Sequence, residues 1–191
     1  MKIGLYFGSF NPIHMGHLVI ASHVANYADV QQVWFVVSPQ NPLKSSTSLL
    51  NEHQRLFLVQ KAIENDNRFK ACDVEFKLPK PSYSIDTLTY LSEKHPEHEF
   101  LIIIGSDSLQ NIKQWKNYKE LLTNYKLIVY ERPGFEVNQI IDEADLCILK
   151  NAPLLNISAT LIRENIRTGK NINYLVLAIV KDEIEKGGYY K

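Results

Sequence analysis

Two histidines three residues apart, in a segment that also contains two glycines, are the first residues with types and spacing suited to chemistry. The segment runs from Gly8 to His17 and reads GSFNPIHMGH. Gly8 follows a short apolar run and would let the chain turn tightly and a phosphate approach the backbone. His14 and His17 would share one side of a first helical turn, where free N–H groups and the helix dipole favour an anion. Because Gly16 leaves room for a bulky ligand, the pattern predicts a nucleotide polyphosphate site.

A metal site and a purely structural turn are the alternatives for this segment. Two histidines with no carboxylate or cysteine between Gly8 and His17 make a poor zinc site, so we expect no metal held by protein side chains. A core histidine beside a chance glycine turn would explain either histidine alone. The complete string, placed between a strand-like run and a helix, favours the phosphate site.

A second candidate segment, NISATLIR, spans residues 156–163. Ser158 is a natural N-cap, and Thr160 adds a second hydroxyl in the first helical turn. Arg163 lies about one turn further on and can bind phosphate oxygens with its planar guanidinium. Residues 150–170 hold four basic side chains against one glutamate, which suits a pyrophosphate leaving group.

The elements that must position these segments alternate along the chain. Short continuous apolar runs alternate with amphipathic stretches, which is typical of a parallel sheet covered by helices on both faces. In such α/β folds ligands bind at the carboxyl ends of the strands, near the switch in strand order. Strands are expected at 2–7, 32–37, 69–76, 100–104, 126–130 and 145–149, and helices at 17–28, 51–63, 85–94, 109–122, 160–168 and 175–185.

Composition limits the classes of protein that the chain can be. Its 191 residues are 45% hydrophobic with zero formal net charge, which suits a single domain over 1–191 and argues against a nucleic-acid or membrane-surface binder. Cys72 and Cys147 lie far apart, so neither a disulfide framework nor a structural zinc site is expected. With neither a membrane-span pattern nor a signal-peptide pattern, we expect a cytoplasmic protein. The sequence leaves a monomer and a homo-oligomer both open.

Five segments together resemble one enzyme family. The first string resembles the nucleotidyltransferase superfamily of the HxGH type, and residues 157–163 match the I-S-x-T-x-x-R signature of the adenylyltransferases. Between them, PSYSIDTL (81–88), IIGSD (103–107) followed by Trp115, and ERPG (131–134) are similar to segments of the nicotinate mononucleotide adenylyltransferases. The resemblance covers nearly the whole chain in the same order. It implies a Rossmann-like doubly wound α/β fold with a small C-terminal helical part.

The resemblance implies transfer of AMP from ATP to nicotinate mononucleotide, giving nicotinate adenine dinucleotide and pyrophosphate in NAD synthesis. His14, His17 and Arg163 would be the catalytic residues, and Mg²⁺ would be held mainly by substrate phosphates. The implied ATP-binding residues are Gly8, Ser9, Phe10, His14, Gly16, His17, Lys44, Gly105, Asp107, Ile157, Ser158, Thr160 and Arg163. Those implied for nicotinate mononucleotide are Ser9, Tyr83, Ser84, Thr87, Asp107, Trp115 and Arg132.

The chemistry of these acceptor residues fits such a substrate. Trp115 can stack on a pyridine ring, and backbone N–H groups at Tyr83–Ser84 can hold its carboxylate. Asp107 can accept from a ribose hydroxyl, and Arg132 can bind the mononucleotide phosphate. Each of these residues could instead serve packing, capping or the surface.

The sequence departs from the family pattern in two loops. Asn41-Pro42-Leu43-Lys44 lacks the histidine usual before the lysine, and Glu131 replaces a basic residue beside Arg132. Another nucleotidyltransferase of the same fold, such as the pantetheine phosphate enzyme, is one alternative, and a preference for nicotinamide mononucleotide is a second. A non-catalytic nucleotide sensor is the third, and the intact histidines and Arg163 argue against it.

Overall fold

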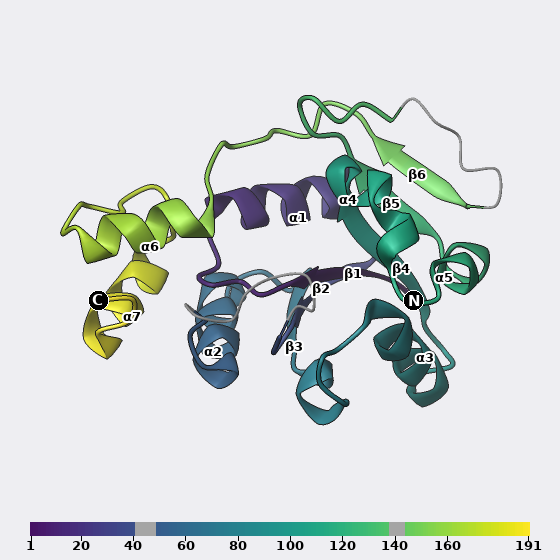
Figure 1. Cartoon of the computed structure of the whole chain (residues 1–191), viewed down its shortest axis with the longest axis horizontal. Coiled ribbons are helices and arrows are strands. Elements are labelled where there is room, and N and C mark those ends of the chain that lie inside the picture. Colours follow the sequence, from purple (N-terminus) through teal and green to yellow (C-terminus); the bar gives the residue numbers. More distant parts are fainter. Residues whose placement is uncertain (41–48, 138–143) are drawn as a thin grey trace.

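In the described residues, which are 1–40, 49–137 and 144–191, six parallel strands form one sheet (Figure 1). The structure is a computed structural model. The strands run in the order β3-β2-β1-β4-β5-β6, which is that of a doubly wound sheet whose switch lies between β1 and β4. Their bounds are β1 (Lys2–Gly8), β2 (Gln32–Val37), β3 (Phe69–Cys72), β4 (Glu99–Gly105), β5 (Leu127–Tyr130) and β6 (Leu146–Leu149).

Helices cover both faces of this sheet and bury two separate apolar clusters. One cluster joins the strands to α1 (Met15–Tyr27), α2 (Glu52–Ile63), α6 (Ala159–Arg167) and α7 (Ala178–Gly187). The other joins them to α3 (Ser84–Lys94), α4 (Ser106–Gln110), α5 (Tyr118–Asn124) and the 3-10 helices η1 (Val74–Lys77) and η2 (Ile112–Gln114). Figure 1 shows α6 and α7 together at the left end of the molecule, away from β6. The predicted α/β fold class is therefore confirmed.

The central strand β4 shows why continuous apolar runs form this sheet. Leu101 and Ile103 pack into the first cluster, whereas Ile102 and Ile104 pack into the second. A strand buried on both faces has no solvent side, so it needs apolar residues at every position. Each such side chain stabilises the fold by roughly 1.5–3 kcal/mol when fully buried.

The structure corrects three of the predicted element boundaries. The strand expected over 69–76 ends at Cys72, because its partner β2 ends at Val37 and the chain then turns into η1. The helix expected over 109–122 is three short pieces, and Asn117 in the left-handed conformation (φ 51°) precedes the last of them. The first helix begins at Met15 rather than at His17. Within the described residues, no helix combines the length and apolar character needed to cross a membrane.

Candidate active site

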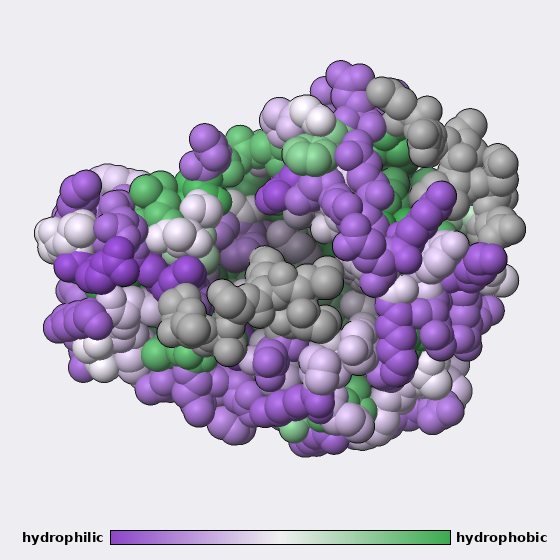
Figure 2. All heavy atoms as spheres, viewed as in Figure 1, coloured by the Kyte–Doolittle hydropathy of each residue, from purple (hydrophilic) through white to green (hydrophobic). Residues whose placement is uncertain are grey.

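The predicted site residues gather at the carboxyl edge of the sheet, on both sides of the switch point. β1 ends at Gly8, and β4 ends at Gly105, which pairs with Tyr130 at the end of β5. Figure 2 shows that this view of the molecule is hollowed near its centre, below α1 as drawn in Figure 1. We call residues 8–17 and 157–163 the histidine side of the site, and residues 83–87, 105–115 and 132 the tryptophan side.

The turn after β1 is held by a buried aromatic ring. Phe10 is 1% exposed and packs edge-on against Tyr6 and Phe35. A Cβ on Gly8 would lie 2.8 Å from the Phe10 ring, so packing as well as turning requires glycine there. With its ring buried, Phe10 can offer a ligand its main chain rather than its side chain. The half-buried Ser9 follows Gly8 in the same turn.

His14 and His17 form a stacked pair at the start of α1. Their ring centroids are 3.7 Å apart with the planes 26° from parallel, and the His14 backbone N–H donates to Nδ1 of His17 at 3.3 Å. Because Nδ1 accepts this hydrogen bond, Nε2 is the ring nitrogen of His17 that can carry a hydrogen and donate it to an oxygen. The two rings and the helix start thus form one group of donors, as predicted for an anion site.

His14 is 7% exposed, and its Nδ1 is buried with no hydrogen-bond partner among the described residues. Burial, followed by the positive charge of Arg132, lowers the pKa of His14 to about 4. His14 is therefore neutral at physiological pH, so it can offer a ligand a hydrogen-bond donor but no positive charge. The influence of Arg132 also shows that the tryptophan side lies within electrostatic reach of the histidine side.

The second motif contacts the first in the folded chain, although most of the sequence separates them. The Ser158 hydroxyl accepts from the backbone N–H of Leu161 at 3.1 Å, which confirms the predicted N-cap of α6. Arg163 donates to the backbone carbonyl of Asn11 at 2.8 Å and to the Thr160 hydroxyl at 3.3 Å. A Cβ on Gly16 would touch the His14 ring at 3.1 Å and the Ile157 carbonyl at 3.8 Å. The two motifs therefore lie next to each other, with Arg163 beside the turn that carries the histidines.

Asp107 and Arg132 form an ion pair on the tryptophan side. Their side-chain atoms lie 3.0 Å apart, and the Arg132 backbone N–H donates to the Ser106 hydroxyl at 2.8 Å. The Asp107 carboxylate folds back over Gly105, where a Cβ would overlap it. The Arg132 side chain is 49% exposed, so a phosphate can compete with Asp107 for it without desolvating a buried charge.

The start of α3 and Trp115 complete this side. Helix α3 begins at Ser84 with Tyr83 as its N-cap, as predicted for the segment that would offer backbone N–H groups. The Nζ of Lys116 lies 4.9 Å from the centre of the Tyr83 ring and pairs with Asp86 at 2.8 Å. Trp115 is half-buried and packs against the second apolar cluster, so part of its ring remains open to a ligand.

The position of Thr87 differs from the prediction, in which its hydroxyl faced a substrate. Its side chain is fully buried, and the hydroxyl donates to Glu75 at 3.0 Å and lies 3.3 Å from the Tyr83 carbonyl. Helical periodicity turns position 87 toward the core rather than the edge of α3. Lys44, also predicted to bind ATP, lies outside the described residues.

Sequence reasoning missed Arg55, which fixes the loops behind the histidine side. Its guanidinium is fully buried and donates to the backbone carbonyls of Ser9 (2.6 Å), Ser38 (2.8 Å), Pro39 (3.1 Å) and Leu50 (2.8 Å). The signal was present, because Arg55 precedes the buried Leu58 and Val59 by three and four residues and so occupies the apolar face of α2.

Glu75 was missed as well. It is 2% exposed and accepts hydrogen bonds from the hydroxyls of Ser82 (2.6 Å) and Thr87 (3.0 Å). Burial raises the pKa of its carboxyl, while these hydroxyls and that of Ser38 oppose the shift. Glu75 thus ties η1 to the segment that starts α3. Spacing alone carried no signal for it, since position 75 lay in an expected strand.

The switch-point location, the phosphate-type donors and the two distant motifs define a nucleotidyltransferase. The cytidylyltransferase-like family model matches residues 5–165. A probable nicotinate-nucleotide adenylyltransferase of Cytophaga hutchinsonii is 50% identical, with 100% of this chain and 98% of that protein covered. One of Flavobacterium psychrophilum is 48% identical over the full length of both. The chain therefore belongs to the nicotinate-nucleotide adenylyltransferase family.

A solved structure confirms the fold independently. The Plasmodium falciparum nicotinic acid mononucleotide adenylyltransferase complexed with NaAD superposes with a TM-score of 0.84. The match covers 99% of this chain and 97% of that protein at 24% identity. Similarity at that identity establishes the fold, and the family assignment stands on the more similar relatives.

Proposed function

We propose that this chain transfers AMP from ATP to nicotinate mononucleotide and releases pyrophosphate, forming nicotinate adenine dinucleotide. One observation carries the proposal: Arg163 donates to the Asn11 carbonyl, which places a guanidinium beside the turn that holds His14 and His17. The names of the relatives support this acceptor, as does the dinucleotide NaAD in the Plasmodium complex.

In this reaction the bonds form and break between the two substrates, and the protein needs to form no covalent bond with either. A phosphate oxygen of the mononucleotide attacks the α-phosphorus of ATP, a new O–P bond forms, and the bond to the bridging α,β oxygen breaks. Pyrophosphate leaves with that electron pair. Because the attacking oxygen already belongs to an anion, no protein base is required. Catalysis then depends on positioning the two phosphates in line and on neutralising the charge that develops.

On the histidine side, Nε2–H of His17 and the neutral His14 would donate to the α-phosphate, and Arg163 would bind the β- and γ-phosphates. The main chain of Gly8, Ser9 and Phe10 would lie along the nucleotide. The remaining proposed ATP contacts are Gly16, Lys44, Gly105, Asp107, Ile157, Ser158 and Thr160.

On the tryptophan side, Trp115 would stack on the pyridine ring, and backbone N–H groups at Tyr83 and Ser84 would bind its carboxylate. Arg132 would exchange Asp107 for the mononucleotide phosphate and release that carboxylate to accept from a ribose hydroxyl. Ser9 lies between the two substrates in this arrangement. Thr87 would act through Glu75, by fixing the start of α3.

Mg²⁺ enters this proposal with ATP, as a complex of its phosphates. Asp107 supplies the one carboxylate among the proposed site residues, so these residues offer no carboxylate cage for a resident ion. Mg²⁺ needs few protein ligands when phosphates and water supply its oxygens.

The direct test supplies purified full-length chain with ATP, Mg²⁺ and one acceptor at a time. Nicotinate mononucleotide, nicotinamide mononucleotide and phosphopantetheine are compared by pyrophosphate release and by chromatography of the adenylylated product. We expect the highest kcat/KM with nicotinate mononucleotide. Turnover with phosphopantetheine but not with the pyridine nucleotides would overturn the proposal, and preference for the amide would overturn its acceptor.

A further inference from the structure

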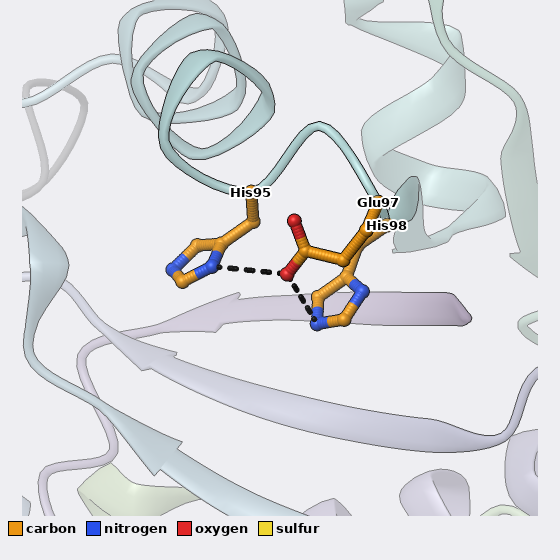
Figure 3. Close-up of side chains that lie close together, drawn as sticks. All are labelled: His95, Glu97 and His98. Atoms are coloured by element: carbon orange, nitrogen blue, oxygen red, sulfur yellow. Dashed lines mark ion pairs between the residues drawn. The ribbon is translucent and has the colours of Figure 1, made fainter.

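Two histidines and a glutamate converge at the edge of the sheet opposite the active site (Figure 3). His95 is the C-cap residue of α3, and Glu97 and His98 immediately precede β4. Strand β4 carries the chain from this cluster to Gly105, which is roughly 20 Å away at 3.3 Å per residue. The cluster is therefore remote from the proposed adenylyl transfer.

The distances within the cluster match those between ligands of one ion. Oε1 of Glu97 lies 3.5 Å from Nδ1 of His95 and 3.4 Å from Nε2 of His98. Both separations are long for a hydrogen bond. Two ligands of a tetrahedral Zn²⁺, each about 2.0–2.2 Å from the metal, are about 3.4 Å apart. The donor atoms of all three residues lie within 4.8 Å of one another, so small side-chain rotations close the third edge.

Packing holds the two imidazole rings in this arrangement. Trp34 meets both rings edge-on, with centroids 6.3 Å from His95 and 6.4 Å from His98. The ring centroids of Phe100 and His98 are 6.1 Å apart, and the planes of the two histidine rings are 13° from parallel. The loop itself is closed by a hydrogen bond from the His98 backbone N–H to the His95 carbonyl at 3.0 Å. Rings fixed by apolar neighbours keep their nitrogens directed toward Glu97 without an ion, which lowers the cost of binding one.

The donor set and the surroundings select the kind of ion. Two imidazoles and one carboxylate suit Zn²⁺ and similar transition metals, whereas Mg²⁺ and Ca²⁺ prefer oxygen ligands alone. A hollow of about 400 Å³ beside the cluster, bordered by Glu97 and His98, leaves space for a water ligand. We propose that His95, Glu97 and His98 bind one divalent transition-metal ion of the Zn²⁺ class, separately from the catalytic site.

Such an ion would join the end of α3 to the start of β4. A ligand that binds the folded chain and not the unfolded one stabilises it in proportion to RT ln(1 + [L]/Kd). The ion would therefore raise the melting temperature without touching substrate.

The test is a titration of the tag-free, chelator-treated full-length chain with Zn²⁺ by calorimetry and with Co²⁺ by absorption and by quenching of tryptophan fluorescence. We expect one ion per chain and a rise in melting temperature on adding Zn²⁺. The double variant His95→Gln, Glu97→Gln should lose saturable binding, because only one of the three proposed ligands remains. Glu97→Gln is isosteric, and His98 keeps its ring against Trp34 in this variant. Far-ultraviolet circular dichroism checks that the fold is retained.

The matched control is His53→Gln, an exposed histidine on α2 outside the cluster. It should bind the metal as the unchanged chain does. Failure of the unchanged chain to give a saturable signal would overturn the proposal. So would full affinity in the double variant, or loss of the ion in His17→Ala instead, because the ion would then lie at the histidine pair of α1. None of these outcomes depends on adenylyl transfer.

Discussion

The two sides of the candidate site are built in different ways. On the histidine side, Phe10 and His14 are buried, and Arg55 and Arg163 donate to main-chain carbonyls of the loops. On the tryptophan side, charged groups pair with one another at the surface, as Arg132 does with Asp107. Bonds to main-chain atoms fix the path of the chain, whereas exposed ion pairs exchange partners at little cost. In the proposed reaction the fixed side meets the transferring phosphate, and the exchangeable side admits the acceptor.

The histidine side should be sensitive to the loss of its buried arginine. Arg55→Met keeps much of the side-chain volume but leaves four carbonyls without their donor, so we expect the free energy of unfolding to fall by about 3–5 kcal/mol. Urea denaturation followed by circular dichroism measures it. Arg68→Met is the control, because Arg68 is partly exposed and its loss should cost less than about 1 kcal/mol. Equal losses in both variants would contradict the stabilising role assigned to the buried Arg55.

Replacement of His17 should give the largest loss of catalytic rate. Replacing it by Ala removes the proposed donor to the α-phosphate, and we expect kcat to fall by at least about 10²-fold, as for other lost transition-state donors. Steady-state pyrophosphate release measures kcat, and the control is His23→Ala, further along α1. A near-normal kcat would remove His17 from the site.

The burial of His14 predicts how stability depends on pH. Its folded pKa of about 4 lies below the ordinary value of 6.5, so between these values the unfolded chain binds the proton and the folded chain does not. Stability from this group is unaffected above pH 6.5 and is lost as pH falls toward 4. At pH 5 the loss should be about 2 kcal/mol. Urea denaturation at pH 7.5 and pH 5 should show this extra pH dependence in the unchanged chain but not in His14→Asn, which keeps a good N-cap. Equal pH dependence in both proteins would contradict it.

The smallest effect is expected on the tryptophan side. Trp115→Ala removes a stacking partner worth about 0.5–1.5 kcal/mol, so the KM for nicotinate mononucleotide should rise up to about tenfold while the KM for ATP stays the same. Trp115→Phe retains an aromatic ring, so its KM for nicotinate mononucleotide should lie between those of the unchanged chain and of Trp115→Ala. Steady-state kinetics with varied nicotinate mononucleotide at saturating ATP measure this KM. An unchanged KM in Trp115→Ala would assign the ring to packing alone.

The parts of the fold that sequence predicted are those governed by local patterns. Apolar runs such as Leu101–Ile104 indicate strands buried on both faces, and hydroxyl residues such as Ser158 indicate helix starts. The break near Asn117 was missed because one residue in the left-handed conformation leaves helical spacing on either side intact. Arg55 and Glu75 were missed because their partners are carbonyls and hydroxyls brought close only by the folded chain.

The hydrogen bond between Arg163 and Asn11 joins residues 152 positions apart in the sequence, and this has a consequence for protein synthesis. A ribosome adds about 5–20 residues per second, so Asn11 and the histidine turn precede Arg163 by about 8–30 seconds. During that interval a nascent chain can form its first strands and helix but cannot close the phosphate end of the site. If Arg163 binds the phosphates as proposed, the ability to bind ATP arrives with one of the last helices to be made, and a prematurely terminated chain would not compete for the nucleotide.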